Sequence, residues 1–360
     1  AIQAYWAKTF PKIYGAKYSP IAGNRIFAGH PGVKFPACQG QQLGYSDVKD
    51  NAFYWRFSLR GREVPPEAEE MAAAIFERGD YERADAVFRL LVECFDGYAE
   101  GYNYLGLIAL ERRELDLAIR HFNETIELGR RLFPARIAKK RFWSDLETRP
   151  FVRGLRNVAM ALNEAGRYSD ALLVCDRLEK ECGDDASWQR SSIYLNSQDW
   201  EEAADHAART RTSSPDAAFV AAFALLELGR AGDALGAFLH GALNYPRTAK
   251  MLTAERASAP RDRQGALDHN AGVYLVRAIH GFRERQNRAS KEFFRRVMRD
   301  PRVASLLAET AEVARRRTEQ HAKGGREAFD RMMEMRSPAF ASAKAAKLDD
   351  LLGAQRRALH

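Results

Sequence analysis

The side chains that most often do chemistry are spread along this 360-residue chain without a catalytic or metal-binding spacing. Its eight histidines include no pair four positions apart, and none is followed by Glu, so an HExxH zinc helix is missing. No phosphate-binding glycine loop and no GxSxG nucleophile turn occurs. The four cysteines (Cys38, Cys94, Cys175 and Cys182) form no CxxC pair, which predicts buried or idle thiols in a reducing compartment. The sequence therefore predicts no catalytic residues, no metal and no cofactor.

Adjacent acids occur twice, at Asp184–Asp185 and at Asp349–Asp350. An acid–base couple needs two carboxylates whose environments push their pKa values apart. No local motif around these acids suggests such an arrangement, so we interpret both pairs as turn or surface carboxylates.

A different chemistry, the binding of a peptide backbone, is indicated by Asn and Arg residues within helical stretches. Arg offers a fork of donors to carboxylates, and Asn offers both a donor and an acceptor. The candidates are Asn103, Leu107, Arg153, Arg156, Asn157, Met160, Asn163, Phe219 and Phe223. That they line one concave groove is implied by the family resemblance of the repeats, which is described below. The alternative is that the polar members of this set simply face solvent.

The elements that would position these side chains repeat along the chain. Ala84 and Ala118 are 34 positions apart, and so are Phe88 and Phe122. The same signature recurs around Ala171, Ala203 and Ala234. A small residue such as Gly106 lets two helices approach, an Ala in the second helix packs on the first, and a Pro ends the unit. One such pair cannot bury its apolar face alone, so neighbouring pairs must stack.

These residues resemble the tetratricopeptide repeat, over about residues 65–246 and in five units. The resemblance implies an all-α fold, an α-solenoid of helix–turn–helix repeats. It also implies a protein-binding scaffold whose first helices line the groove. We divide the chain into an irregular N-terminal segment 1–62, a repeat array 63–246, a linker 247–268 and a basic helical C-terminal region 269–360 that caps the array.

An insertion interrupts the array, because Ala118 and Ala171 are separated by one repeat and 19 further residues. The surplus covers about residues 133–151. We expect "LETRPF" to start the next helix, with Thr148 as its N-cap and Pro150 in its first turn. Phe142 and Trp143 are either partner-binding anchors or side chains that fill a gap in the stack, and we favour the second interpretation.

The N-terminal segments "QAYWAKTFPKIYGAKYSP" and "DNAFYW" resemble the start of bacterial neutral zinc metallopeptidases. Because the zinc helix of that family is missing, the resemblance implies a non-catalytic remnant, or a regulatory partner of such a peptidase.

The chain carries a formal net charge of +8, concentrated in residues 277–360, which hold 20 Lys and Arg against 11 Asp and Glu. The leading hypothesis is a non-enzymatic protein-interaction scaffold that binds a peptide or partner protein in its groove. The alternative is nucleic-acid binding through basic C-terminal helices, with interleaved Glu arguing for a solvated surface. The basic residues in question are Arg315, Arg316, Arg317, Lys323 and Arg326.

No window of the sequence approaches the length of apolar residues that a membrane span requires. We expect no membrane partner and a cytoplasmic location. The chain starts at Ala1 without Met, so removal of a leader, and hence export, stays an alternative. The partner's identity and the oligomeric state are not predicted.

Overall fold

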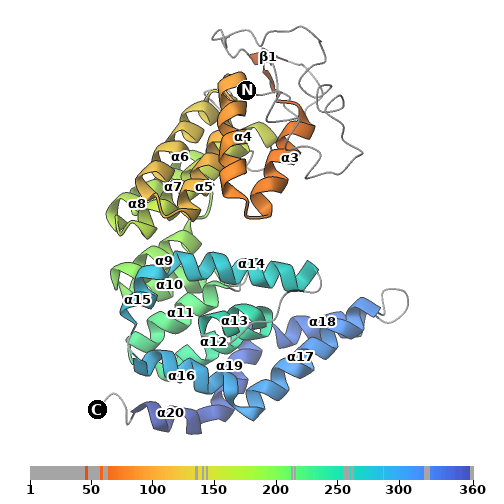
Figure 1. The fold of residues 1–360 in the computed structure, drawn as a ribbon. Coiled ribbons are helices and arrows are strands. Elements are labelled where there is room, and N and C mark those ends of the chain that lie inside the picture. The colour runs from red at the N-terminus through yellow and green to blue at the C-terminus, as the bar shows by residue number, and fades with distance from the viewer. Residues whose placement is uncertain are drawn as a thin grey trace. The chain divides into compact units, whose positions relative to one another are not determined.

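The computed structural model describes residues 45–47, 57–59, 64–133, 137–139, 142, 145–211, 214, 216–253, 260, 263–286, 288–319 and 325–356. The chain divides into two compact units, Ala1–Ala161 with Asp176–Asp184, and Leu162–Cys175 with Asp185–His360. This division runs through α7 (Arg149–Glu164) and α8 (Tyr168–Arg177), inside the predicted array. The described residues are almost entirely helical, which confirms the all-α class (Figure 1). The exceptions are β1 (Tyr45–Asp47) and β2 (Phe57–Leu59), a short antiparallel pair within the segment predicted to be irregular.

The predicted repeat region forms successive pairs of helices. The first pair is α3 (Pro66–Glu77) with α4 (Tyr81–Cys94), and the second is α5 (Ala99–Glu111) with α6 (Leu115–Arg130). The third is α7 with α8, which continues as a π-helical turn, Leu178–Cys182. The fourth and fifth are α9 (Ser187–Ser197) with α10 (Trp200–Thr210), and α11 (Ala217–Glu227) with α12 (Ala231–Asn244). In the first unit each of α3, α4 and α5 packs on the helix that follows it. In the second unit each of α9, α10 and α11 does so, and α9 also contacts α11, so the architecture is helical and repeat-like.

Each first helix ends in the same kind of turn. A residue with φ between 64° and 77° follows it: Gly79, Arg113, Gly166, Gln198 or Gly229. In the first pair the N–H of Asp80 then donates to Ile75 O at 3.3 Å, and in the fifth the N–H of Arg230 donates to Leu225 O at 2.9 Å. These bonds satisfy carbonyls that the helix end leaves open. Gly is favoured at such positions because a residue with a Cβ is strained in the left-handed conformation. Arg113 and Gln198 are the two turns in which a residue other than Gly takes this conformation.

The packing between paired helices follows the predicted small-residue pattern. The alanines predicted at the seam have no exposed surface: Ala84, Ala118, Ala171, Ala203 and Ala234. Gly106 lies directly against the Phe122 ring, and a Cβ there would overlap that ring. The prediction that the helices of the second pair touch at Gly106 is therefore confirmed.

The second unit continues beyond the fifth pair with helices that close its core. They are α13 (Pro246–Leu252), α14 (Arg263–Ala278), α15 (His280–Arg285), α16 (Arg288–Arg299), α17 (Pro301–Glu319), α18 (Gly325–Met335), α19 (Pro338–Ala345), a 3₁₀ turn (Ala346–Leu348) and α20 (Asp349–Arg356). Helix α12 contacts α11, α13, α16 and α19, and the Phe238 and Phe294 rings stack 4.4 Å apart. The predicted linker 247–268 is thus helical at both of its ends.

The insertion before α7 is anchored by a buried aromatic cluster. Phe142 is 7% exposed, and its ring lies 5.4 Å from that of Phe133 and 6.2 Å from that of Phe151. Helix α7 begins at Arg149, as predicted. The Thr148 hydroxyl donates to the carbonyls of Phe142 and Asp145. Its role as the N-cap of α7 stays a prediction. Phe142 therefore fills the stack and offers little surface to a partner, which corrects its assignment as a docking anchor. Trp143 lies outside the described residues.

Candidate functional site

Three of the predicted groove side chains and one that was not predicted form a connected polar cluster on α5 and α7. The Asn157 side-chain amide donates to Asn103 Oδ1 at 2.7 Å, and Asn103 in turn donates to Glu100 Oε1 at 3.1 Å. Arg153 Nη2 lies 3.1 Å from Glu100 Oε2. Spacings of three residues on α5 and four on α7 place each pair on one helix face. We call Glu100, Asn103, Arg153 and Asn157 the α5–α7 cluster.

Glu100 is the carboxylate of this cluster, largely but not fully buried, and sequence reasoning missed it. Burial raises its pKa, against the Arg153 charge and the Asn103 hydrogen bond, which lower it. The Arg153 side chain keeps 42% of its surface exposed, so the ion pair lies at the rim, where its contribution to stability is small. The cluster presents an exposed guanidinium and a half-buried side-chain amide over a largely buried carboxylate.

Arg156 is held by its own chain. Its Nε and Nη2 atoms each donate to an oxygen of Asp184 at 2.8 Å, which makes a two-pronged contact. The Arg156 guanidinium was expected to bind a carboxylate of a ligand in this two-pronged way, and here it binds a carboxylate of its own chain.

The adjacent acids were interpreted as turn or surface carboxylates, and two of them make contacts of that kind. Asp185 accepts the N–H of Ser187 at 2.9 Å, and Asp350 pairs with Arg302 at 2.9 Å.

The apolar candidates differ in exposure. Leu107 and Asn157 are half-buried, whereas Met160 is only 7% exposed. Phe219 has no exposed surface and packs on Phe238 and Gly241 inside the fifth pair, so it belongs to the core and not to a groove wall. Phe223 is 3% exposed, because Phe282 and Phe294 cover it. The two phenylalanines on α11 are therefore core residues. The spacing of apolar residues in the sequence could not distinguish a side chain in the core from one that lines a groove.

The strongest arrangement in the second unit links Asn163, at the end of α7, with Asn196, at the end of α9. Asn196 Nδ2 donates to Asn163 Oδ1 at 2.8 Å, and both side chains donate to the carbonyl of Ala278 at 2.8 Å. Asn196 Oδ1 accepts the backbone N–H of Phe282 at 2.8 Å. The two amides therefore hold the main chain of a segment that follows more than eighty positions later.

Asn196 was not predicted, although a signal for it exists. Asn163 and Asn196 are 33 positions apart and both stand near the C-terminal ends of first helices. The fourth pair is shorter than the others, which obscures the alignment at this point. Asn163 was predicted to bind a peptide backbone, and in the structure it binds one from its own chain.

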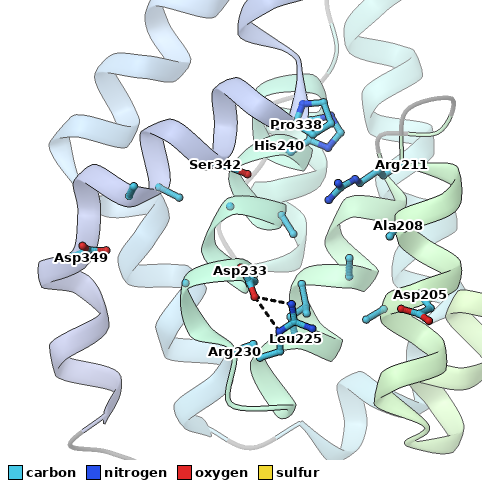
Figure 2. Close-up of a pocket in the computed structure, with 17 residues that line it drawn as sticks. Asp205, Ala208, Arg211, Leu225, Arg230, Asp233, His240, Pro338, Ser342 and Asp349 are labelled. Carbon is cyan, nitrogen blue, oxygen red and sulfur yellow. Dashed lines mark hydrogen bonds and ion pairs between the residues drawn. The ribbon is translucent and has the colours of Figure 1, made fainter.

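A cavity of about 540 Å³ lies among α10, α11, α12 and α19 (Figure 2). Arg230 and Asp233 pair across 2.8 Å on its wall. His240 also lines it, 2% exposed, with an Nδ1 atom that is buried and lacks a hydrogen-bond partner among the described residues. Ser342 lines the same cavity, and Figure 2 marks no hydrogen bond between it and His240.

Four basic residues of the nucleic-acid alternative contact nearby acidic or aromatic groups. Arg315 and Arg316 both donate to Glu312 at 2.8 Å, and these bonds lower the pKa of Glu312 to about 2. Arg317 lies over the Phe329 ring at 5.1 Å, and Arg326 is 3.9 Å from Asp330. Lys323 lies outside the described residues. Such local pairing leaves less uncompensated charge for phosphates.

Within the described part of the chain, no three His, Cys, Asp or Glu side chains come together as a metal site requires. The peptidase-like segment before residue 45 is not among the described residues. None of the described helices combines the length and apolarity needed to cross a bilayer. No family model matches the chain, and no curated protein matches it significantly.

Proposed function

We propose that this protein is a non-enzymatic interaction scaffold which binds a peptide, or a peptide-like segment of a partner protein, on the faces formed by the first helices of its pairs. The tetratricopeptide-like repeat signature of the sequence and the repeat-like helical pairs agree with this function. The observation that supports it most directly is that the Asn163 and Asn196 side chains form hydrogen bonds with the main chain at Ala278 and Phe282.

Main-chain binding by side-chain amides suits a scaffold, because the amides recognise a backbone and leave selectivity to neighbouring apolar contacts. In the first unit, the α5–α7 cluster offers groups of the same chemistry, with Asn157 half-buried and Arg153 partly exposed. Leu107, one turn beyond Asn103 on α5, adds a half-buried apolar side chain. We assign the external partner to this face.

The test is selection of displayed short peptides on the full-length chain, followed by affinity measurement with variants. Leu107→Asp and Asn157→Ala should each weaken the selected peptides by about 10-fold or more. Leu173→Asp is the matched control, since Leu173 is 63% exposed on the second helix α8. Enrichment of no peptide, or equal losses in the control, would contradict the proposed function.

A further inference from the structure

The face of α9 and α11 in the second unit is already covered by a stretch of the same chain. We call residues Tyr274–Arg285, the end of α14 and all of α15, the α14–α15 segment. We infer that this segment is an intramolecular ligand, and that the external partner of this face is a helical peptide that carries the same pattern and replaces it. The inference rests on the proposed function and names the partner class for one of its faces.

The hydrogen bonds fall at the break between two helices. Helix α14 ends at Ala278 and α15 starts at His280, so the Ala278 carbonyl and the Phe282 N–H lie among the groups that helix ends leave open. The amides of Asn163 and Asn196 satisfy the carbonyl, and the Asn196 oxygen satisfies the N–H, as a local cap would. A ligand of this face must therefore present a helix break at the corresponding place.

Apolar side chains supply the selectivity. Leu275 and Ile279 have no exposed surface and Phe282 is 3% exposed, at spacings of four and three residues. The Phe282 ring lies 5.3 Å from that of Phe223 and 5.9 Å from that of Trp200. Leu275 lies before the helix break, Ile279 at it and Phe282 after it. Closely spaced apolar anchors of this kind are the usual way in which a helical peptide binds in a groove.

Small residues and flanking charge complete the pattern. A Cβ on Gly281 would lie 3.0 Å from the Tyr168 hydroxyl, so the position favours Gly. Arg277 Nε is 3.6 Å from Glu164 Oε2, whose side chain is 2% exposed, and the Arg285 guanidinium donates to the Asn196 carbonyl. The expected partner is thus a basic amphipathic peptide with the order Leu, Arg, Ala, Ile, Gly, Phe and Arg found in "LVRAIHGFRER".

Competition between the two ligands sets the measurable effect. A tethered segment acts at an effective concentration of roughly millimolar, so an added peptide binds the intact chain weakly. Loosening the segment should strengthen binding of the added peptide. Arg277→Ala/Arg285→Ala does this without removing a buried apolar side chain, so the apolar anchors stay, although the buried Glu164 carboxylate loses Arg277 as its ion-pair partner.

The probe is a fluorescent synthetic peptide of residues 269–286, titrated into the full-length chain. We expect the Arg277→Ala/Arg285→Ala variant to bind it at least about 10-fold more tightly than the unmodified chain does. Adding Asn196→Ala should reverse that gain, and a probe with Phe282→Ala should not bind. Arg83→Ala/Arg326→Ala, an equal loss of charge at two exposed ion pairs, should bind as weakly as the unmodified chain.

Hydrogen exchange gives a second reading on the same samples. With saturating probe, amide exchange at residues 278–286 should accelerate, while α11 and α12 keep their protection. Equal binding to all folded variants, insensitivity to Asn196→Ala, or no binding to any of them would show that the segment is a permanent part of the core. Any of those results would leave the peptide selection on the first unit unaffected, so the two proposals fail separately.

Discussion

Asn196 and Phe282 are joined across 86 positions by one hydrogen bond, in which the side-chain oxygen of Asn196 accepts the Phe282 N–H at 2.8 Å. The same side chain donates to Asn163 and to Ala278. Every polar atom of the Asn196 amide is therefore used, and it is 2% exposed. Through this residue the fourth helical pair is tied to both the third pair and the α14–α15 segment.

Asn196→Ala should lower the free energy of unfolding by about 2–4 kcal/mol, because it leaves buried donors and acceptors without partners. The matched control is Asn157→Ala, which removes one hydrogen bond at a half-buried position and should cost about 1 kcal/mol. Urea unfolding followed by circular dichroism measures both. Equal costs for the two variants would contradict the role assigned to Asn196.

Two glycines on helices should respond oppositely to the same change. Gly106→Ala should destabilise the chain by about 1–3 kcal/mol, because the new Cβ would overlap the Phe122 ring. Gly232→Ala should stabilise it by about 0.5–1 kcal/mol, since the nearest atom is a Leu352 methyl 3.8 Å away and Ala is the better helix former. Thermal melts of both variants decide this, and a stabilised Gly106→Ala variant would exclude the close helix contact.

His240 should make stability depend on pH. Burial, and then the nearby Arg211 charge, lower its pKa from 6.5 to about 4, while a hydrogen bond with the Arg336 backbone acts the other way. The unfolded chain therefore takes up a proton between these values and the folded chain does not. Stability contributed by neutral His240 is complete above pH 6.5 and is lost as the pH falls towards 4, by up to about 3 kcal/mol. A His240→Gln variant should lack this part of the slope in urea unfolding, and an unchanged slope would contradict the assignment.

The buried thiols should be unreactive in the folded chain. Burial, followed by the Glu181 and Asp184 charges, raises the pKa of Cys182 to about 12, and Cys175 has no exposed surface. Iodoacetamide at mildly alkaline pH should modify both far more slowly than the half-buried Cys94, as read by peptide mass spectrometry. Rapid labelling of Cys182 before unfolding would contradict this prediction.

The sequence was sufficient for the helical pairs, because their period depends on small residues that cannot be exchanged freely. Ala84, Ala118 and Gly106 each lie at a seam where a larger side chain has no room. The sequence also allowed the burial of Phe142 to be predicted, because filling a gap in the stack was favoured over binding a partner. Whether the fold is a tetratricopeptide solenoid in detail stays a prediction.

The candidate site was only partly predictable. Asn103, Arg153 and Asn157 come together as the repeat alignment indicated, but Glu100 joins them because an acid three positions before Asn103 shares its helix face. Phe219 was misassigned, since a helix that is apolar all round gives no sign of which side faces a groove. The α14–α15 segment could not be foreseen, because its contacts with Asn163 and Asn196 depend on tertiary distance and not on sequence spacing.

The most direct test of the account is a hydrogen-exchange footprint of the full-length chain with and without a peptide selected on it. The account predicts slower exchange on the first helices of the first unit, at Ala99–Glu111 and at residues 149–161, with the second helices α4 and α6 unchanged. Protection confined to α4 and α6, or to the basic helices α17 and α18, would contradict the assignment of the binding face to the α5–α7 cluster.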